Sequence, residues 1–378
     1  MTASVKAIIK PELLEWARKS AGYKTLAEPA TKIGVKEEKL ASWEAGRDRP
    51  TVVQLRKIAE VYKRPIAVFY LPAPPKGVDV LHDFRTISGS AVGAYSPVLT
   101  YEIRRAYHRR EKAIEMYEDL GEKPMSVELK AALNDNVDST AEKIREFLSV
   151  TRELQESWKN PYDSLNGWKN AVESRGILVF QASKIEVNEM RGFSIATQPL
   201  PAIVLNSKDA PYGRIFTLLH ELTHIALRSD GVCTLDSAAR DKTEIFCNAV
   251  AGSTLLPSAW LMSTSGWDDE TIRSVSKKFG MSSQVVLRRL LSLGKISQTQ
   301  YETKKSIYER EAELHLAKQS EKQIIVEQST KAIAAAGKLF TRLVLDCYHQ
   351  NKVTTSDVSD LLSVRVQHLG DIEHKVYG

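Results

Sequence analysis

The sequence predicts an α+β protein that is predominantly helical, with a small sheet in its central part. Helical periodicity recurs along the chain from residue 11 to residue 362. Three short runs rich in β-branched and aromatic residues, typical of strands, occur at 177–180, 192–196 and 202–206. An H-E-x-x-H set lies inside an apolar helical pattern at 216–227, directly after these runs. We therefore expect a metal-binding helix packed beside a small sheet.

Length, composition and cysteine usage limit the class of protein. With 378 residues, 43% of them hydrophobic, the chain is long enough for two or three domains with real cores. The first residues lack a signal-peptide pattern, and no apolar run approaches the ~18 residues that span a bilayer. Cys233, Cys247 and Cys347 are odd in number and lack C-x-x-C spacing, which argues against a disulfide framework and a cysteine-ligated zinc. We expect a cytoplasmic protein with no membrane partner.

The first domain, residues 1–75, is predicted to be a basic helical module. It holds 14 lysines and arginines against 8 acidic residues, whereas the rest of the chain holds 39 of each. Gly34 and Gly46 stand where two of its helices end, and Thr51 is a predicted N-cap. Four short helices are indicated, at about 11–20, 25–33, 36–45 and 51–62. This order is a helix-turn-helix architecture, and its charge is typical of a nucleic-acid-binding module.

The segment 34–51 resembles the recognition region of XRE-type (lambda-repressor-like) helix-turn-helix domains. The resemblance rests on Trp43-Glu44-x-Gly46 followed by Arg49-Pro50-Thr51. In that fold the third helix lies in the major groove of DNA, which implies DNA contacts from its outward residues, Lys36, Lys39 and Ser42. We expect Pro29 to interrupt the second helix, and Glu37 and Glu38 to face phosphates. A helical protein-interaction or dimerisation module is the alternative.

Residues 76–163 are predicted to be a linker followed by a helical segment. Proline and glycine are dense around 75–95, which favours a linker. A strong helical pattern at 98–119 contains a basic run that includes Arg109 and Arg110, and because acidic residues interleave with it we expect a solvated helix face. Two further helices are expected at 127–134 and 139–149, the second with Ser139 as its N-cap.

The H-E-x-x-H set predicts a metal site in the third domain, residues 164–262. His220 and His224 share one face of a helix and can bind one metal ion, while Glu221 stands beside them as a base. The helix is apolar nearly all round, where these side chains would be costly unless they coordinated something; satisfied core histidines are the alternative. The order helix, three strands, H-E-x-x-H helix is that of the zincin fold, in which an edge strand pairs with an extended substrate.

Two histidines need a third protein ligand, which leaves the fourth position of zinc for water. A second helix follows the motif, and Glu244 stands in it twenty residues after His224. We predict Glu244 as the third ligand and Asn248, one turn later, as a hydrogen-bonding neighbour of the site. An exposed first-turn glutamate is the alternative for Glu244. Asp236 and Asp241 are poorer candidates because they lie outside the apolar stripe.

The chain also resembles the ImmA/IrrE family of zinc peptidases, in the subgroup that carries an XRE domain. The residues that carry the resemblance are Asn206, the run 214–224, Glu244-x-x-Cys247-Asn248-Ala249-x-Ala251, Leu255-Leu256-Pro257, and Arg64-Pro65 with 69–75. It implies Zn²⁺ bound by His220, His224 and Glu244, with Glu221 as the catalytic base. Thr223 stands where the family commonly has glycine and is expected to point away from the metal.

The reaction that the resemblance implies is metal-assisted amide hydrolysis. Zinc would polarise the scissile carbonyl and activate water, while Glu221 takes the water proton and returns it to the leaving amine. Tyr212 and Arg214, just before the motif, are candidate oxyanion donors from sequence position only. The implied substrate is a protein partner, such as a repressor, antitoxin or toxin in a phage, stress or toxin–antitoxin switch.

An alternative function is that of a DNA-binding regulator or toxin–antitoxin component whose zinc domain senses or scaffolds. A domain that reads a DNA palindrome would favour a homodimer.

The fourth region, residues 263–378, is predicted to be helical throughout. A helix, a turn at Gly280 and a helix capped by Ser282 are indicated over 268–293. A similar pair is indicated at 340–350 and 354–362, and a charged helix at 301–322. Packing helices are the default interpretation, with wings over the cleft, a docking surface or DNA contacts as alternatives.

Overall fold

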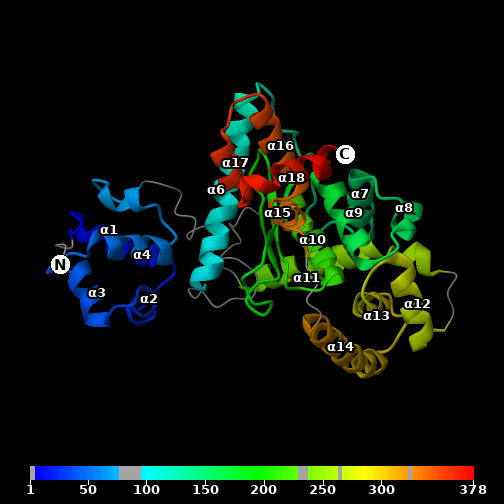
Figure 1. Ribbon diagram of the computed structural model, residues 1–378. Helices are drawn as coiled ribbons and strands as arrows, with labels where there is room; N and C mark the ends of the chain where they lie inside the picture. The colour runs from blue at the N-terminus through cyan, green and yellow to red at the C-terminus, as the bar shows by residue number, and fades with distance from the viewer. Residues whose placement is uncertain (1–4, 76–94, 229–236, 263–265, 322–325) are drawn as a thin grey trace. The chain divides into compact units, whose positions relative to one another are not determined.

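The protein consists of two compact units, Met1–Arg105 and Ala106–Gly378 (Figure 1). The computed structural model describes residues 5–75, 95–228, 237–262, 266–321 and 326–378. Within these ranges, no helix is both long enough and apolar enough to cross a membrane. The predicted linker falls mostly at 76–94, outside the described residues, and the finer domain limits at 75, 163 and 262 stay predictions.

The first unit contains the four helices that the sequence predicts, together with the start of α6. Thr51 begins the fourth helix, because its Oγ1 accepts a hydrogen bond from the Gln54 N–H and the Gln54 side chain accepts one from the Thr51 N–H. Pro29 does not interrupt the second helix, contrary to expectation, because it stands in the first turn, where its missing N–H costs no helical bond. The elements are α1 (Pro11–Ser20), α2 (Ala27–Ile33), α3 (Glu37–Glu44), α4 (Val52–Val61) and the 3₁₀ helix η1 (Ile66–Tyr70).

A buried ion pair joins α1 to α3. Arg18 Nε lies 2.9 Å from Glu44 Oε1, and Arg18 Nη2 lies 3.0 Å from Glu44 Oε2. The third guanidinium nitrogen donates to the carbonyl of Tyr23. The two side chains are 8% and 10% exposed, so the pair is shielded from water and its two-point geometry fixes the position of α3.

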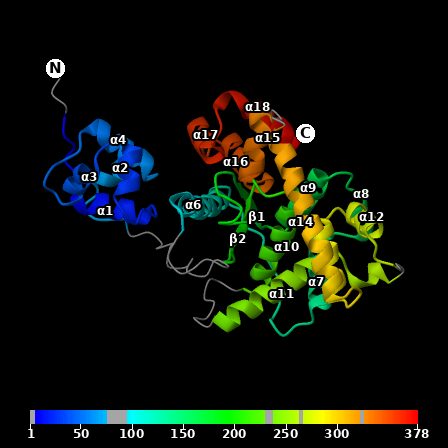
Figure 2. The same ribbon diagram turned by 90° about the horizontal axis from the view of Figure 1, so that it is seen from below.

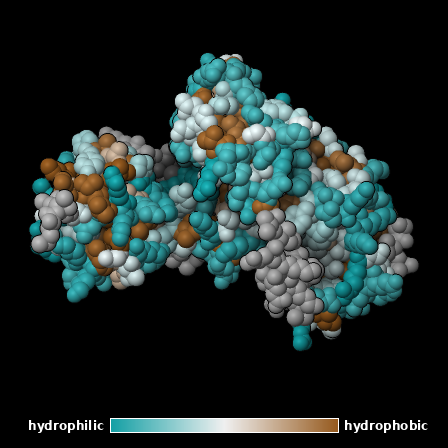
Figure 3. Space-filling model, viewed as in Figure 1, coloured by the Kyte–Doolittle hydropathy of each residue, from teal (hydrophilic) through white to brown (hydrophobic). Residues whose placement is uncertain are grey.

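The exposed apolar residues of the first unit lie outside α3. Figure 3 shows brown, hydrophobic side chains next to teal, hydrophilic ones on this unit. The exposed apolar residues belong to the N-terminal extended segment, α4 and the η1 region: Val5, Ile8, Val53, Tyr70 and Leu71. The exposed residues of α3 and of its N-cap are polar instead, namely Lys36, Glu37, Glu38 and Lys39.

The second unit has a small sheet surrounded by helices, and α6 (Pro97–Asp119) continues into it from the first unit. Its three strands and the two predicted C-terminal helix pairs are confirmed. Helix α7 begins earlier than predicted, because Asn136 Oδ1 accepts from the Ser139 N–H and makes Asn136 the N-cap. The elements are α7 (Val137–Leu148), α8 (Arg152–Ser157), α9 (Pro161–Glu173), β1 (Leu178–Ala182), β2 (Gly192–Ile195), β3 (Ala202–Asn206), α10 (Pro211–Ala226), α11 (Ser237–Leu255), η2 (Ser258–Leu261), α12 (Asp269–Phe279), α13 (Ser283–Ser292), α14 (Gln298–Glu321), α15 (Gln328–Ala336), α16 (Lys338–His349), α17 (Thr355–Leu362), η3 (Val366–His368) and α18 (Leu369–Tyr377).

The sheet has the order β1-β3-β2, with β1 and β3 parallel and β2 antiparallel to β3. One face, with Val179 and Ile203, joins the same core as α9 and α10. On the other face Phe180 packs edge-on against Phe340 of α16, with ring centroids 5.7 Å apart. Figure 2 shows β2 close to α10, and α10 packs against both β2 and β3. Strand β2 lies at one edge of the sheet, beside the helix that carries the H-E-x-x-H set.

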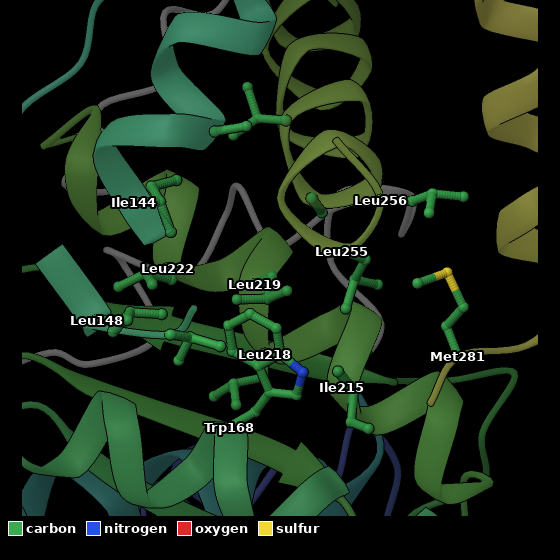
Figure 4. Packing of buried hydrophobic residues seen from close by; sticks show 14 of the residues in the cluster. Ile144, Leu148, Trp168, Ile215, Leu218, Leu219, Leu222, Leu255, Leu256 and Met281 are labelled. Atoms are coloured by element: carbon green, nitrogen blue, oxygen red, sulfur yellow. The ribbon is translucent and has the colours of Figure 1, made fainter. Parts of the chain in front are cut away.

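One hydrophobic core holds α7, α9, α10 and α11 together (Figure 4). Leu218 and Leu222 of α10 are fully buried, and so are Trp168 of α9 and Leu255 of α11. At ~25 cal/mol per Å² of apolar surface removed from water, each such side chain contributes roughly 1.5–3 kcal/mol relative to an exposed position. This packing fixes α10 and α11 relative to each other, and these two helices carry the candidate metal ligands.

The predicted helix at 127–134 is wrong. This segment is not helical: residues 127–132 have no regular secondary structure and 133–134 form a turn, while Val127 and Leu129 are buried at alternate positions. The Ala131 N–H donates to the carbonyl of Ala226 at the end of α10, at 2.9 Å. The two apolar side chains therefore bury one side of the segment, and its backbone satisfies a carbonyl that has no partner within α10.

The expected solvated face of α6 is also wrong at Arg109 and Arg110, which are buried. Arg110 donates to three carbonyls of the 197–200 loop between β2 and β3, at 2.6–3.0 Å. Arg109 donates to carbonyls near the C-terminal ends of α15 and α17, at 3.0 and 3.1 Å. Two arginines of the basic run are thus buried and donate hydrogen bonds to backbone carbonyls of other segments.

Candidate metal centre

Three side chains from two helices meet at one point. His220 Nε2 and His224 Nε2 on α10 lie 3.1 Å apart. Glu244 of α11 places Oε2 at 3.3 Å from His220 Nε2 and Oε1 at 3.4 Å from His224 Nε2. In the part of the chain that the structure describes, this is the one cluster of three or more histidine, cysteine or acidic side chains that could hold a metal ion. The structure therefore brings together the three ligands that the sequence predicts.

The local sequence explains how α10 presents its histidines. Pro211 stands in the first turn, where a missing N–H is tolerated, and apolar residues bury the helix on nearly all sides. Thr223 is fully buried and its hydroxyl donates to the Leu219 carbonyl at 2.8 Å. It therefore bonds its own helix, and the threonine does not take part in the cluster.

The electrostatics of the cluster favour a cation. Burial alone would lower the pKa of His224, but hydrogen bonds with Cys247 and Glu244 and the charge of Glu221 outweigh it and raise the pKa to about 11. Positive charge is thus stabilised where the two Nε2 atoms face the carboxylate. Two imidazoles and one carboxylate are a donor set that suits Zn²⁺, and a metal ion there would take the place of the proton.

The predicted base lies beside the cluster. Glu221 is buried, and its Oε2 accepts a hydrogen bond of 2.8 Å from the hydroxyl of Ser194 on β2. Ser194 is not recognisable as a site residue from the sequence, because its contact depends on how the sheet packs against α10. The signal that could have found it is a polar residue inside a strand run that is otherwise apolar, at the sheet edge expected to face the motif helix.

Cys247 is a second neighbour of the cluster that is not among the predicted site residues. It is fully buried one turn after Glu244 and shares a hydrogen bond with His224. Burial raises the pKa of its thiol, which keeps it in the neutral form. A hydrogen-bonding group next to a metal-binding imidazole orients the ring. Nδ1 of His220 is buried and has no such partner among the described residues.

Comparisons with known proteins divide the chain into two recognised parts. Residues 14–69 match the family model described as Helix-turn-helix, and residues 172–291 match the peptidase M78 model described as the IrrE N-terminal-like domain. These two matches support a fusion of an XRE-type helix-turn-helix segment with an ImmA/IrrE-like segment. The second match runs from the end of α9 through α13 and indicates a metallopeptidase family. No curated protein and no solved structure matches the chain.

The remaining predicted site residues of the ImmA/IrrE-like domain are Arg214, Tyr212 and Asn248. The Arg214 guanidinium is buried, donates to Gln181 Oε1 at 2.7 Å and lies over the ring of Tyr162. Tyr212 is half-buried against the core, and burial raises the pKa of its hydroxyl. Asn248 is exposed on α11.

The oxyanion role of Tyr212 and Arg214 and the hydrogen-bonding role of Asn248 stay predictions. The side chains of the alternative ligands Asp236 and Asp241 lie outside the described residues.

In the helix-turn-helix domain, the predicted DNA contacts differ in their surroundings. Lys36 is exposed at the N-terminus of α3. Lys39 is exposed but lies 2.6 Å from Asp48, and this ion pair, with a second from Lys6, holds the pKa of the Asp48 carboxyl well below its usual range. Ser42 donates its hydroxyl to the Lys39 carbonyl. Lys36 is thus exposed without an ion pair among the described residues, whereas a phosphate would have to compete with Asp48 for Lys39.

Proposed function

We propose that this chain is a zinc-dependent regulatory endopeptidase that cleaves a specific protein partner such as a repressor or an antitoxin. The observation that carries the proposal is the convergence of His220, His224 and Glu244 beside a buried Glu221. A peptidase must also hold the extended backbone of its substrate. The edge strand β2 could do so, because it lies next to the helix that carries the two histidines. The match to an M78 peptidase model supports the same reaction class.

In this proposal three residues of the chain bind the metal ion and a fourth transfers a proton. The two imidazoles and the Glu244 carboxylate would hold Zn²⁺, and zinc supplies a Lewis acid that activates water and polarises a carbonyl. Glu221 accepts the proton of the attacking water and delivers it to the nitrogen of the leaving amine. Glu221 is suited to both steps, because it adjoins a ligand in the sequence and accepts a hydrogen bond that leaves one oxygen for the proton.

The proposal is tested by searching for new protein N-termini. A lysate of the cell that produces the protein is incubated with the full-length chain, either zinc-loaded or stripped of metal by a chelator, and the N-termini are labelled and identified by mass spectrometry. We expect a small number of new termini that appear only with the zinc-loaded protein and return when zinc is restored. Identical sets of termini with and without zinc would contradict the proposal.

A second function, DNA binding by the first unit, is favoured by the helix-turn-helix match and by the polar surface of α3. We propose that it binds the DNA upstream of its own gene through α3. Lys36→Ala is expected to weaken binding in a gel shift and to lower the slope of affinity against salt by about one. Lys57→Ala on α4, which is also exposed, is the matched control. Absence of binding at low salt would contradict this function.

A further inference from the structure

A serine on the edge strand reaches the predicted catalytic base. Ser194 Oγ donates to Glu221 Oε2 at 2.8 Å, and Ser194 is half-buried while Glu221 is buried. A carboxylate can turn about its last bond, so a fixed donor restricts the direction in which its second oxygen points. We infer that Ser194 is a positioning residue that holds Glu221 in the orientation required for proton transfer. This inference rests on the proposed peptidase function.

The packing of β2 against α10 is suited to this contact. Residues two apart in a strand face the same side at a spacing of about 6.8 Å, and residues four apart on a helix share a face at a spacing of about 6 Å. Gly192 and Ser194 of β2 can therefore stand opposite Thr217 and Glu221 of α10 as two matched pairs.

The first of these pairs explains the glycine. A Cβ at Gly192 would collide with Cγ2 of Thr217 and would lie 3.0 Å from the carbonyl oxygen of Val204 and 3.6 Å from Cγ of Glu221. A larger residue at 192 would push the strand away from the helix. The close approach that glycine permits lets a side chain as short as that of serine reach the carboxylate at hydrogen-bond distance.

The place of Ser194 at the sheet edge connects the base to the substrate. Among the strands of the described residues, β2 pairs with β3 alone. The other edge of β2 can pair with an extended peptide, as proposed above for the substrate. A peptide bound there would order the strand that carries Ser194. The same strand would then hold the substrate and orient the base.

The first test measures Glu221 directly and needs no substrate. The full-length protein is labelled with ¹³C at the side-chain carboxyl of glutamate, and the Glu221 signal is assigned by its absence in E221Q. We expect S194A to shift this signal and S194T, which keeps the hydroxyl, to leave it near the wild-type position. The control is S174A, which removes an exposed hydroxyl that donates only to a carbonyl of its own helix. An unshifted signal in S194A, or equal shifts in S194A and S194T, would overturn the inference.

The second test separates orientation from substrate binding. Cleavage of a library of fluorescence-quenched peptides is followed with zinc-loaded wild type, S194A, S194T and S174A. We expect S194A to lower kcat about tenfold with KM unchanged, because misplacing a proton acceptor affects the chemical step rather than binding. A raised KM with unchanged kcat would overturn the inference. If the wild type cleaves no peptide and also produces no zinc-dependent termini in the lysate, the proposed peptidase function fails, and the carboxyl signal still decides whether Ser194 positions Glu221.

Discussion

Replacing Glu221 with glutamine is expected to lower the rate of peptide cleavage by about 10²–10⁴-fold while zinc stays bound. Glutamine has nearly the same shape and can still accept the hydrogen bond of Ser194 through its carbonyl oxygen, so the fold and the strand contact are kept. It cannot accept the proton of the attacking water. The loss therefore falls on proton transfer rather than on metal binding or packing.

The Glu221 variant is measured together with its zinc content. The matched control is Glu186→Gln, which changes an exposed glutamate that pairs with Lys208 on the surface of the same unit. We expect the control to cleave like the wild type. Equal cleavage by E221Q and wild type would remove Glu221 from the reaction, and loss of zinc from E221Q would mean that the residue has a metal-binding role.

Replacing Glu244 with glutamine is expected to weaken zinc binding more than any other single carboxylate substitution in the described residues. Loss of a group that only orients a ligand costs roughly 10- to 100-fold in affinity, and removal of a charged ligand should exceed about 100-fold. The amide keeps the shape of the side chain but removes the negative charge that lies 3.3 and 3.4 Å from the two Nε2 atoms. Competition with a chromophoric chelator measures the change.

The control for Glu244 is Glu270→Gln in the exposed first turn of α12, which should leave zinc affinity unchanged. An unchanged affinity in E244Q would show that the third ligand is elsewhere. Asp236 and Asp241 would then be the next residues to replace, because they follow the motif in the same stretch of chain.

The sequence predicted those parts of the site that depend on local geometry. His220 and His224 share a face because four residues make about one helical turn, and this requires no knowledge of the rest of the fold. The position of Glu244 needed one further step, the packing of a second apolar helix against the first. The structure places its carboxylate oxygens 3.3 and 3.4 Å from the Nε2 atoms of His220 and His224.

The contacts that the sequence did not predict all join segments far apart in the chain. Ser194 reaches Glu221 because an edge strand packs beside α10. Arg110 looked like part of a solvated basic run, yet it is buried and bonds the loop between β2 and β3. Residues 127–134 are not the predicted helix, and within them the Ala131 N–H donates to the Ala226 carbonyl at the end of α10. Periodicity within one element carries no information on which neighbour covers it.

The X-ray absorption spectrum of the zinc-loaded, full-length protein tests the central claim most directly. A site built from His220, His224 and Glu244 predicts nitrogen and oxygen scatterers at about 2.0–2.2 Å, with the outer-ring scattering of two imidazoles and no sulfur. The alternative is a sulfur ligand from Cys247, whose buried thiol shares a hydrogen bond with His224. A sulfur scatterer at about 2.3 Å would place Cys247 on the metal, close the position needed for water, and contradict a hydrolytic centre.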